Sequence, residues 1–180
     1  MRTQPSGILL ARPVPAHPTA NSSRSAILQP DMDAELVNEV RLQVLRTTID
    51  TMTVPSAPET AAVLGISSEQ GVEAYRQLGD GHVYVLEPGD ATRLRMANPF
   101  SAVPTAFRAE AGRKSYYGNC VWDALGVVSL MGGNGQVKTC CPDCGETLTL
   151  VTLGHELVQK EGVVHFSVPA AHWWDDIIYT

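Results

Sequence analysis

The chain has 180 residues, 44% of them hydrophobic and 18% charged, and its formal net charge at pH 7 is −6. This length predicts one ordinary domain or two small ones with a genuine core. The acidic balance argues against non-specific binding to nucleic acid or anionic membranes, because the excess of Lys and Arg that neutralises phosphates is missing. No apolar run approaches the length of a membrane-spanning helix.

Residues 1–30 contain five prolines among Ser, Thr, Ala and Asn. Such a segment has little to bury and shows no periodicity, so we predict a disordered leader. Its apolar run Ile8–Ala11 is too short for the core of a signal peptide.

Residues 31–97 are predicted to form a first folded unit, which begins with an amphipathic helix opened by Asp31 and Asp33. The stripe that this helix buries comprises Leu36, Val37, Val40 and Val44. The proline-containing stretch 54–58 ends the helix.

A helix-turn-helix is predicted over residues 59–78. A short helix ends at Gly65, and Ser67 with Gln70 forms a capping box that begins a second helix. A hairpin follows, with strands at 82–86 and 92–96 around a turn. Helices followed by a hairpin are typical of a winged-helix-like domain.

The helix-turn-helix invites a DNA-binding interpretation, but the charges of its second helix oppose it. That helix offers Arg76 against Glu69 and Glu73, whereas a helix that reads duplex DNA needs several donors for phosphates and base edges. We therefore expect no nucleic-acid partner and interpret the winged helix as a packing module.

Residues 98–180 are predicted to form a small α+β domain with a mixed sheet. A mostly apolar helix runs from Cys120 to Leu130 and is halted by glycines. The predicted strand segments are 107–110, 115–117, 136–139, 147–153 and 163–168.

The most informative motif is Cys120-x-x-Asp123 at the start of this helix. A thiol and a carboxylate three residues apart project from one helical face. Asn119 is predicted to be the N-cap, so that the helix N-terminus would favour the thiolate of Cys120. The pair would supply a soft, metal-seeking sulfur beside a group that can accept or deliver a proton. The alternative is a buried structural cysteine beside an ordinary first-turn carboxylate.

The other three cysteines lie together in Thr139–Gly145, as Cys140, Cys141 and Cys144. An adjacent pair is an awkward start for a disulfide framework, so a reduced, cytoplasmic setting is expected. The Cys-x-x-Cys of Cys141 and Cys144 is half of a zinc site, which His155, His165 or His172 could complete. An accessible thiol cluster for a soft metal and ordinary turn cysteines are the alternatives. A thioredoxin-like role is weaker, because no strand-to-helix context follows the motif.

From about residue 55 to residue 180 the sequence resembles the alkylmercury (organomercurial) lyase family. The resemblance rests on the winged-helix segment, the motif Asn98-Pro99-Phe100-Ser101, the stretch Asn119–Leu125 with its Cys-x-x-Asp, the glycine turn, Cys141, and the segment 163–180. It implies a winged-helix-like unit packed on an α+β catalytic domain.

The resemblance implies cleavage of a carbon–mercury bond by protonolysis. Cys120 would capture the organomercurial, and Asp123 would manage the proton that ends on the departing carbon. Mercury prefers thiolate sulfur, and each added sulfur makes the carbon more basic, which agrees with these roles. Hg(II) would be the product, no cofactor would be required, and organomercurials, cellular thiols and a mercuric reductase as downstream acceptor would be the partners.

The family uses a second catalytic cysteine after a segment like Trp173–Tyr179, and this sequence has no cysteine after Cys144. The predicted metal ligands are therefore Cys120, Cys141 and Cys144, the latter two as possible substitutes for the second thiol. Two other functions stay open. One is a non-catalytic soft-metal or thiol-sensing protein with a winged helix. The other is a relative that uses Cys120 as the nucleophile of an unrelated reaction.

Overall fold

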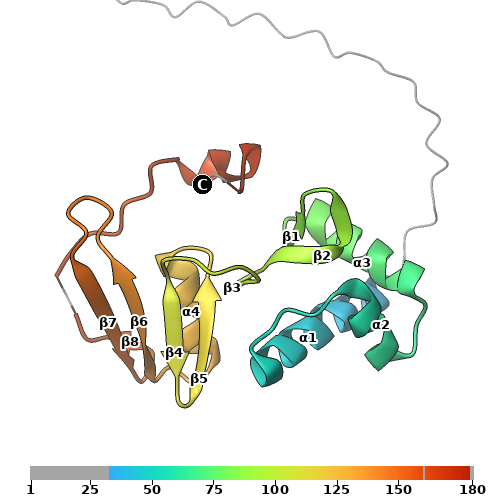
Figure 1. Ribbon diagram of the computed structural model, residues 1–180, viewed down its shortest axis with the longest axis horizontal. Helices are drawn as coiled ribbons and strands as arrows, with labels where there is room; N and C mark the ends of the chain where they lie inside the picture. Colours follow the sequence, from blue (N-terminus) through green and yellow to red (C-terminus); the bar gives the residue numbers. More distant parts are fainter. Residues whose placement is uncertain (1–32, 160, 179–180) are drawn as a thin grey trace, which may run out of the picture. The chain divides into compact units, whose positions relative to one another are not determined.

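The computed structural model describes residues 33–159 and 161–178 (Figure 1). The leader predicted at residues 1–30 lies outside the described residues. Within them, no helix is both long and apolar enough to cross a membrane.

The first elements are three helices and a hairpin, as the sequence predicts (Figure 1). The elements are α1 Ala34–Thr51, α2 Ala57–Leu64, α3 Ser68–Asp80, β1 Tyr84–Glu87 and β2 Asp90–Ala97. The predicted capping box of α3 is present, since the Ser67 side chain accepts from the backbone of Gln70, whose side chain in turn accepts from the backbone N–H of Ser67. Gly65 ends α2 in the left-handed conformation, with φ of 69°.

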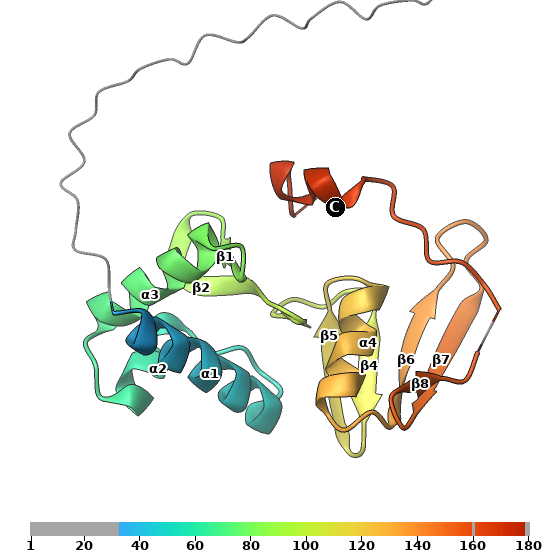
Figure 2. The ribbon, with the colours of Figure 1, turned by 180° about the vertical axis from the view of Figure 1, so that it is seen from behind.

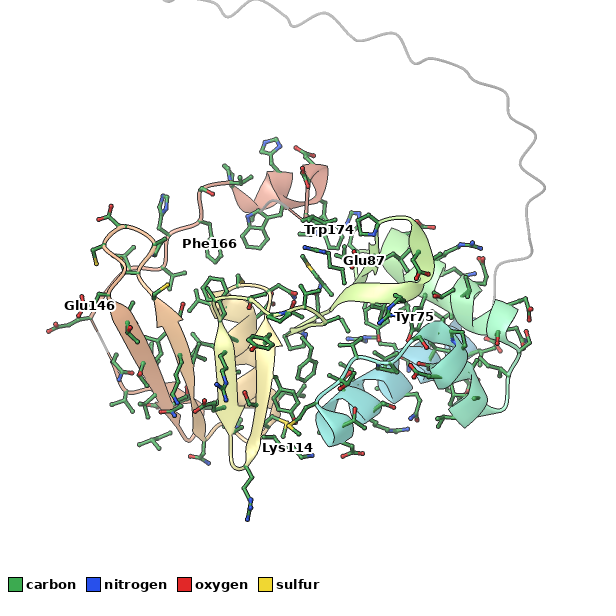
Figure 3. The ribbon with its side chains drawn as sticks, in the orientation of Figure 1. Tyr75, Glu87, Lys114, Glu146, Phe166 and Trp174 are labelled. Carbon is green, nitrogen blue, oxygen red and sulfur yellow. The ribbon has the colours of Figure 1, made fainter. Side chains whose placement is uncertain are left out.

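Two aromatic residues organise the core of this first part. Tyr75 and Tyr84 are fully buried and meet edge to face, with ring centroids 5.9 Å apart. The Tyr75 hydroxyl lies 2.9 Å from the Thr60 hydroxyl and donates to the Pro55 carbonyl, so its buried polar end is satisfied (Figure 3). The predicted stripe of α1 is partly confirmed, because Val40 and Val44 lie in this core.

One antiparallel sheet runs through the whole described part, in the order β1-β2-β3-β5-β4-β6-β7-β8. The remaining strands are β3 Phe100–Ser101, β4 Arg108–Ala111, β5 Lys114–Gly118, β6 Gly135–Cys140, β7 Thr147–Leu153 and β8 Glu156–Leu157. The α+β class is confirmed, but the predicted mixed sheet is wrong, since every pairing among the described residues is antiparallel. Strands β5 and β6 run in the same direction and are joined through a helix, but β4 lies between them, so this crossover makes no parallel pair.

The helix α4, Val121–Leu130, packs against β4, β5 and β6 on one face of the sheet (Figures 1 and 2). It buries Ala124, Val127 and Val128 in a second core with Phe100 and Val137. Because α4 is apolar nearly all round, its burial fixes the start of the helix firmly on the end of β5.

The strand predicted at 163–168 is wrong: residues 161–166 have no regular structure, and a bend follows. A 3-10 helix, η1 Ala170–Asp175, comes next. Its Trp174 stacks on His82 at 4.0 Å between ring centroids, and Trp173 donates to the Val168 carbonyl (Figure 3).

Candidate functional site

Cys120 is the N-cap of α4, one residue later than the sequence predicts. Its backbone is extended, and its sulfur accepts a hydrogen bond from the Asp123 N–H at 3.4 Å. The side chain of Asn119 is instead used elsewhere, because its amide donates to Asn98 Oδ1 at 3.1 Å. The thiol is therefore held at the first turn of the helix, pointing at the residue three positions on.

The carboxyl group of Asp123 lies beside this thiol. Cys120 Sγ is 3.5 Å from Asp123 Oδ2, with the thiol as donor, and Asn119 also contributes a side-chain hydrogen bond to Asp123. Thus Asn98, Asn119 and Asp123 form a short chain of side-chain contacts ending at the sulfur. The predicted pair is brought together, and two asparagines orient it.

Burial governs the acidity of both groups. It raises the pKa of the Cys120 thiol, and the Asp123 charge raises that pKa further, against the opposing backbone N–H of Asp123. The pKa of Asp123 is likewise raised by burial, although hydrogen bonds from Asn119 and Cys120 oppose the shift. The backbone N–H groups of Asp123 and Trp122 at the helix N-terminus favour the thiolate, as the sequence predicts, but burial outweighs them and the pKa of the Cys120 thiol is raised. Burial thus shifts both groups of the pair toward their neutral forms.

The junction between β5 and α4 positions this pair through Gly118. A Cβ on Gly118 would lie 2.5 Å from the Ala124 backbone nitrogen, so no larger residue fits there. Gly118 donates to the Phe107 carbonyl at 2.9 Å and accepts from the Thr105 hydroxyl at 2.6 Å. Strand and helix thus meet at backbone contact, two residues before the thiol.

The other three cysteines lie at the turn between β6 and β7. Cys141 donates its N–H to the Glu146 carbonyl at 2.8 Å, and Gly145 donates to the Cys141 carbonyl at 2.9 Å. Hydrogen bonds from the backbone of Cys144 and Asp143 lower the pKa of Cys141. All four cysteines of the chain are free thiols.

The three predicted metal-ligand cysteines do not converge on one ion. Among the described residues, no three His, Cys, Asp or Glu side chains are placed to share a metal. The histidines considered as zinc ligands have other surroundings. His155 bonds Ser129, His172 pairs with Asp175, and His165 is exposed. A zinc site completed by these histidines is therefore not formed.

A cavity of about 550 Å³ lies away from Cys120. It is lined by the segment between α1 and α2 and by parts of β2, β3 and β5, with Arg93 and Glu59 among its polar groups and Phe100 among its apolar ones. Neither Cys120 nor Asp123 lines it. We place the candidate site at the thiol and carboxyl pair, because there the structure joins a soft nucleophile to a proton carrier at the start of a helix.

Sequence reasoning missed the part that Asn98 and Asn119 play. These residues are 21 positions apart, and their contact depends on how β3 pairs with β5. The available signal was the motif beginning at Asn98, which the family resemblance already contained.

Comparison with known proteins relates the chain to one family. Residues 100–180 match the family model described as "MerB: Alkylmercury lyase", and this stretch contains Cys120, Asp123 and the cysteine turn. Among solved structures, the "Crystal structure of the mercury-bound form of MerB2" is similar, with a TM-score of 0.55 and 16% sequence identity. The match covers 71% of this chain and 60% of that one. No curated protein matches significantly. The resemblance predicted from the sequence is thereby confirmed.

Proposed function

We propose, from the premise that this chain is a MerB-like protein by its residues 100–180, that it cleaves carbon–mercury bonds of organomercurials. The observation that carries the proposal is the 3.5 Å approach of Cys120 Sγ to Asp123 Oδ2 inside the matched segment. A soft sulfur captures mercury, and a carboxyl group within hydrogen-bonding reach carries the proton that cleavage requires.

The first step is capture. The Cys120 sulfur bonds to mercury and displaces its counter-ligand, while the thiol proton passes to the Asp123 carboxylate. Because burial raises the pKa of Asp123, its carboxylate accepts this proton more readily than an exposed aspartate would. Capture also replaces a buried neutral thiol by a sulfur–mercury bond, so no bare thiolate has to persist in the site.

The second step is protonolysis. The proton of Asp123 moves to the carbon bound to mercury, the carbon–mercury bond breaks, and a hydrocarbon leaves. A second thiolate bonds to mercury as the carbon departs, so that Hg(II) stays two-coordinate. A cellular thiol supplies this sulfur. Among the described residues, Cys141 and Cys144 do not lie close enough to Cys120 and its neighbouring carboxyl group to hold one metal ion with them. A further thiol releases Hg(II), which a mercuric reductase would accept.

Benzene release from phenylmercuric acetate under excess glutathione tests the proposal by headspace gas chromatography. Cys120→Ser should abolish benzene release. Asp123→Asn should keep stoichiometric capture but slow release by at least about 10²-fold, the usual contribution of a positioned proton donor. Cys140→Ser is the matched control and should keep both activities. Benzene release unchanged in Cys120→Ser would refute the assignment.

A second candidate function is a metal-responsive binding protein of the same reduced, cytoplasmic setting. It is favoured by the three helices and hairpin of residues 34–97, interpreted as a winged helix, together with the exposed cysteines of the β6–β7 turn. Tight Hg(II) binding with no hydrocarbon release, and Hg(II)-dependent retention on DNA, would establish it in place of the lyase.

A further inference from the structure

The turn between β6 and β7 holds two thiols in a preformed loop outside the Cys120 site. Strand β6 ends at Cys140, which pairs with Thr147 of β7. Backbone hydrogen bonds from Cys141 to Glu146 and from Gly145 to Cys141 close the loop, and Gly145 adopts a φ of +75° that favours glycine. The loop is therefore shaped by its backbone, before any ligand is present.

Within this loop the sulfur of Cys141 is oriented by the backbone. It accepts N–H groups of Asp143 and Cys144, and it also has a side-chain contact with the Cys144 thiol. The closed loop and the Cys-x-x-Cys spacing thus hold the two sulfurs as neighbours. Cys144 is exposed and Cys141 partly so, which leaves the pair open to solvent.

The loop lies at the same edge of the sheet as Cys120. Strands β5 and β6 both pair antiparallel with β4, so they run in the same direction (Figure 1). Arg108 of β4 is opposite Tyr117 on one side and Lys138 on the other. Two strand spacings, about 10 Å, separate these flanking positions. Cys120 and Cys141 each follow three residues later; Glu146 marks this edge in Figure 3, and Lys114 the opposite one.

We propose that Cys141 and Cys144 form a second thiol site that binds Hg(II) as a two-coordinate bis-thiolate, independently of Cys120. The exchange balances: Hg(II) held by two small thiols passes to the two protein sulfurs, and the two small thiols leave with the two cysteine protons. The gain over free thiols comes from effective concentration, since the second sulfur is already held beside the first.

The chemistry of the loop selects a soft, two-coordinate cation. Zinc requires four ligands in a tetrahedron, and the described residues provide no third donor beside this pair. Hg(II) takes two thiolates, and soft sulfur is its preferred ligand. Cys140 is the last residue of β6, in register with Thr147, and precedes the loop, so we assign the pair to Cys141 and Cys144.

This inference deepens the proposed function, since it gives the Hg(II) product a second acceptor at the edge where it is formed. Its test is separable, because binding is measured in a Cys120→Ser background where no cleavage is possible. A variant that loses only cleavage still binds Hg(II) at Cys141 and Cys144. A variant that loses this second site can still be assayed for benzene release.

The experiment is native mass spectrometry of the Cys120→Ser chain with HgCl₂ under excess glutathione, with thiolate-to-mercury ultraviolet absorption as a second readout. One Hg(II) per chain is expected. Adding Cys141→Ser or Cys144→Ser should weaken retention by at least about tenfold. Adding Cys140→Ser, the matched control, should leave retention unchanged.

Three outcomes would overturn the proposal: no retained Hg(II) in Cys120→Ser, undiminished retention without Cys141 or Cys144, or loss of retention in the Cys140→Ser control. Displacement of the bound Hg(II) by equimolar ZnCl₂ would also overturn it. Circular dichroism of each variant verifies the fold, so that reduced binding is read as loss of ligands.

Discussion

At the scale of single residues, the site keeps the carboxyl group of Asp123 partly buried, away from the water that would stabilise its charged form. Asp123 has a folded-state pKa above its ordinary value because of burial. The unfolded chain therefore ionises first as pH rises, and Asp123 reduces stability progressively from about pH 4 upwards, through its raised pKa. This loss of stability is absent at lower pH, where Asp123 is protonated in both the folded and the unfolded chain. A proton carrier is thus maintained at the expense of stability.

Asp123→Asn is accordingly expected to raise the melting temperature at pH 7 while it slows benzene release. The gain should shrink below pH 4, where the native carboxyl is also neutral. Differential scanning calorimetry at both pH values measures this, with Glu39→Gln on the exposed side of α1 as the control. A lower melting temperature at pH 7 would contradict the role of burial.

The sequence predicted the reacting pair but not its surroundings. Cys120 and Asp123 are three positions apart, so helix geometry alone brings them together. Asn119 ranks above cysteine as a cap, yet in the fold its amide serves Asn98 and Asp123, and the cap passes to Cys120. The raised pKa of the thiol could not be predicted either, because it depends on burial by residues distant in the sequence.

At the scale of elements, the junction of β5 and α4 decides where the thiol lies. Because α4 buries Ala124, Val127 and Val128, the close contact of Gly118 with Ala124 sets the register of its first turn. Nearby Gly126 differs, because a Cβ there would meet only Pro99, at an ordinary 3.7 Å.

These two glycines make a matched pair. Gly118→Ala should destabilise the protein by about 1–3 kcal/mol through overpacking and should lower mercury capture by Cys120. Gly126→Ala should stabilise it by roughly 0.5–1 kcal/mol, because alanine is the better residue within a helix. Urea unfolding of both variants measures the difference in unfolding free energy. Equal changes in the two variants would contradict the role of the β5–α4 junction in positioning the thiol.

Most strands could be predicted from alternation, because β4 to β7 lie where a neighbour is close in the sequence. The alternating segment 163–168 forms no strand and does not pair with the sheet. Strand β8 already occupies the free side of β7, and Val158 and Gln159 add further bonds to Val151. An apolar–polar alternation forms a strand only where a partner strand is free to receive it.

At the scale of the whole described chain, the predicted boundary at 97/98 falls inside a continuous sheet. Strand β2 pairs with β3 directly across that position. Val54 packs against both cores, and the last turn of α1 receives hydrogen bonds from Tyr116 and Lys114 through the Ile49 carbonyl, both at 2.7 Å. Sequence could not predict this coupling, because its partners are 65 and 67 positions apart.

Tyr116→Phe should therefore cost about 1 kcal/mol of unfolding free energy, the usual value of one lost hydrogen bond. Tyr117→Phe on the more exposed neighbouring position is the control and should cost less. Urea denaturation followed by tryptophan fluorescence and circular dichroism measures both. Transitions that separate in Tyr116→Phe alone would show that this bond holds the two cores in one cooperative unit.

The ends of the sheet have a consequence for solubility. In the described part of the chain its outermost strands are β1, of four residues with two register shifts, and β8, of two residues. Short or irregular border strands are poor templates for another chain, because too few backbone groups lie in line to be paired. The described part of the chain thereby offers another chain little backbone for edge-to-edge pairing, although its sheet stays open at both ends.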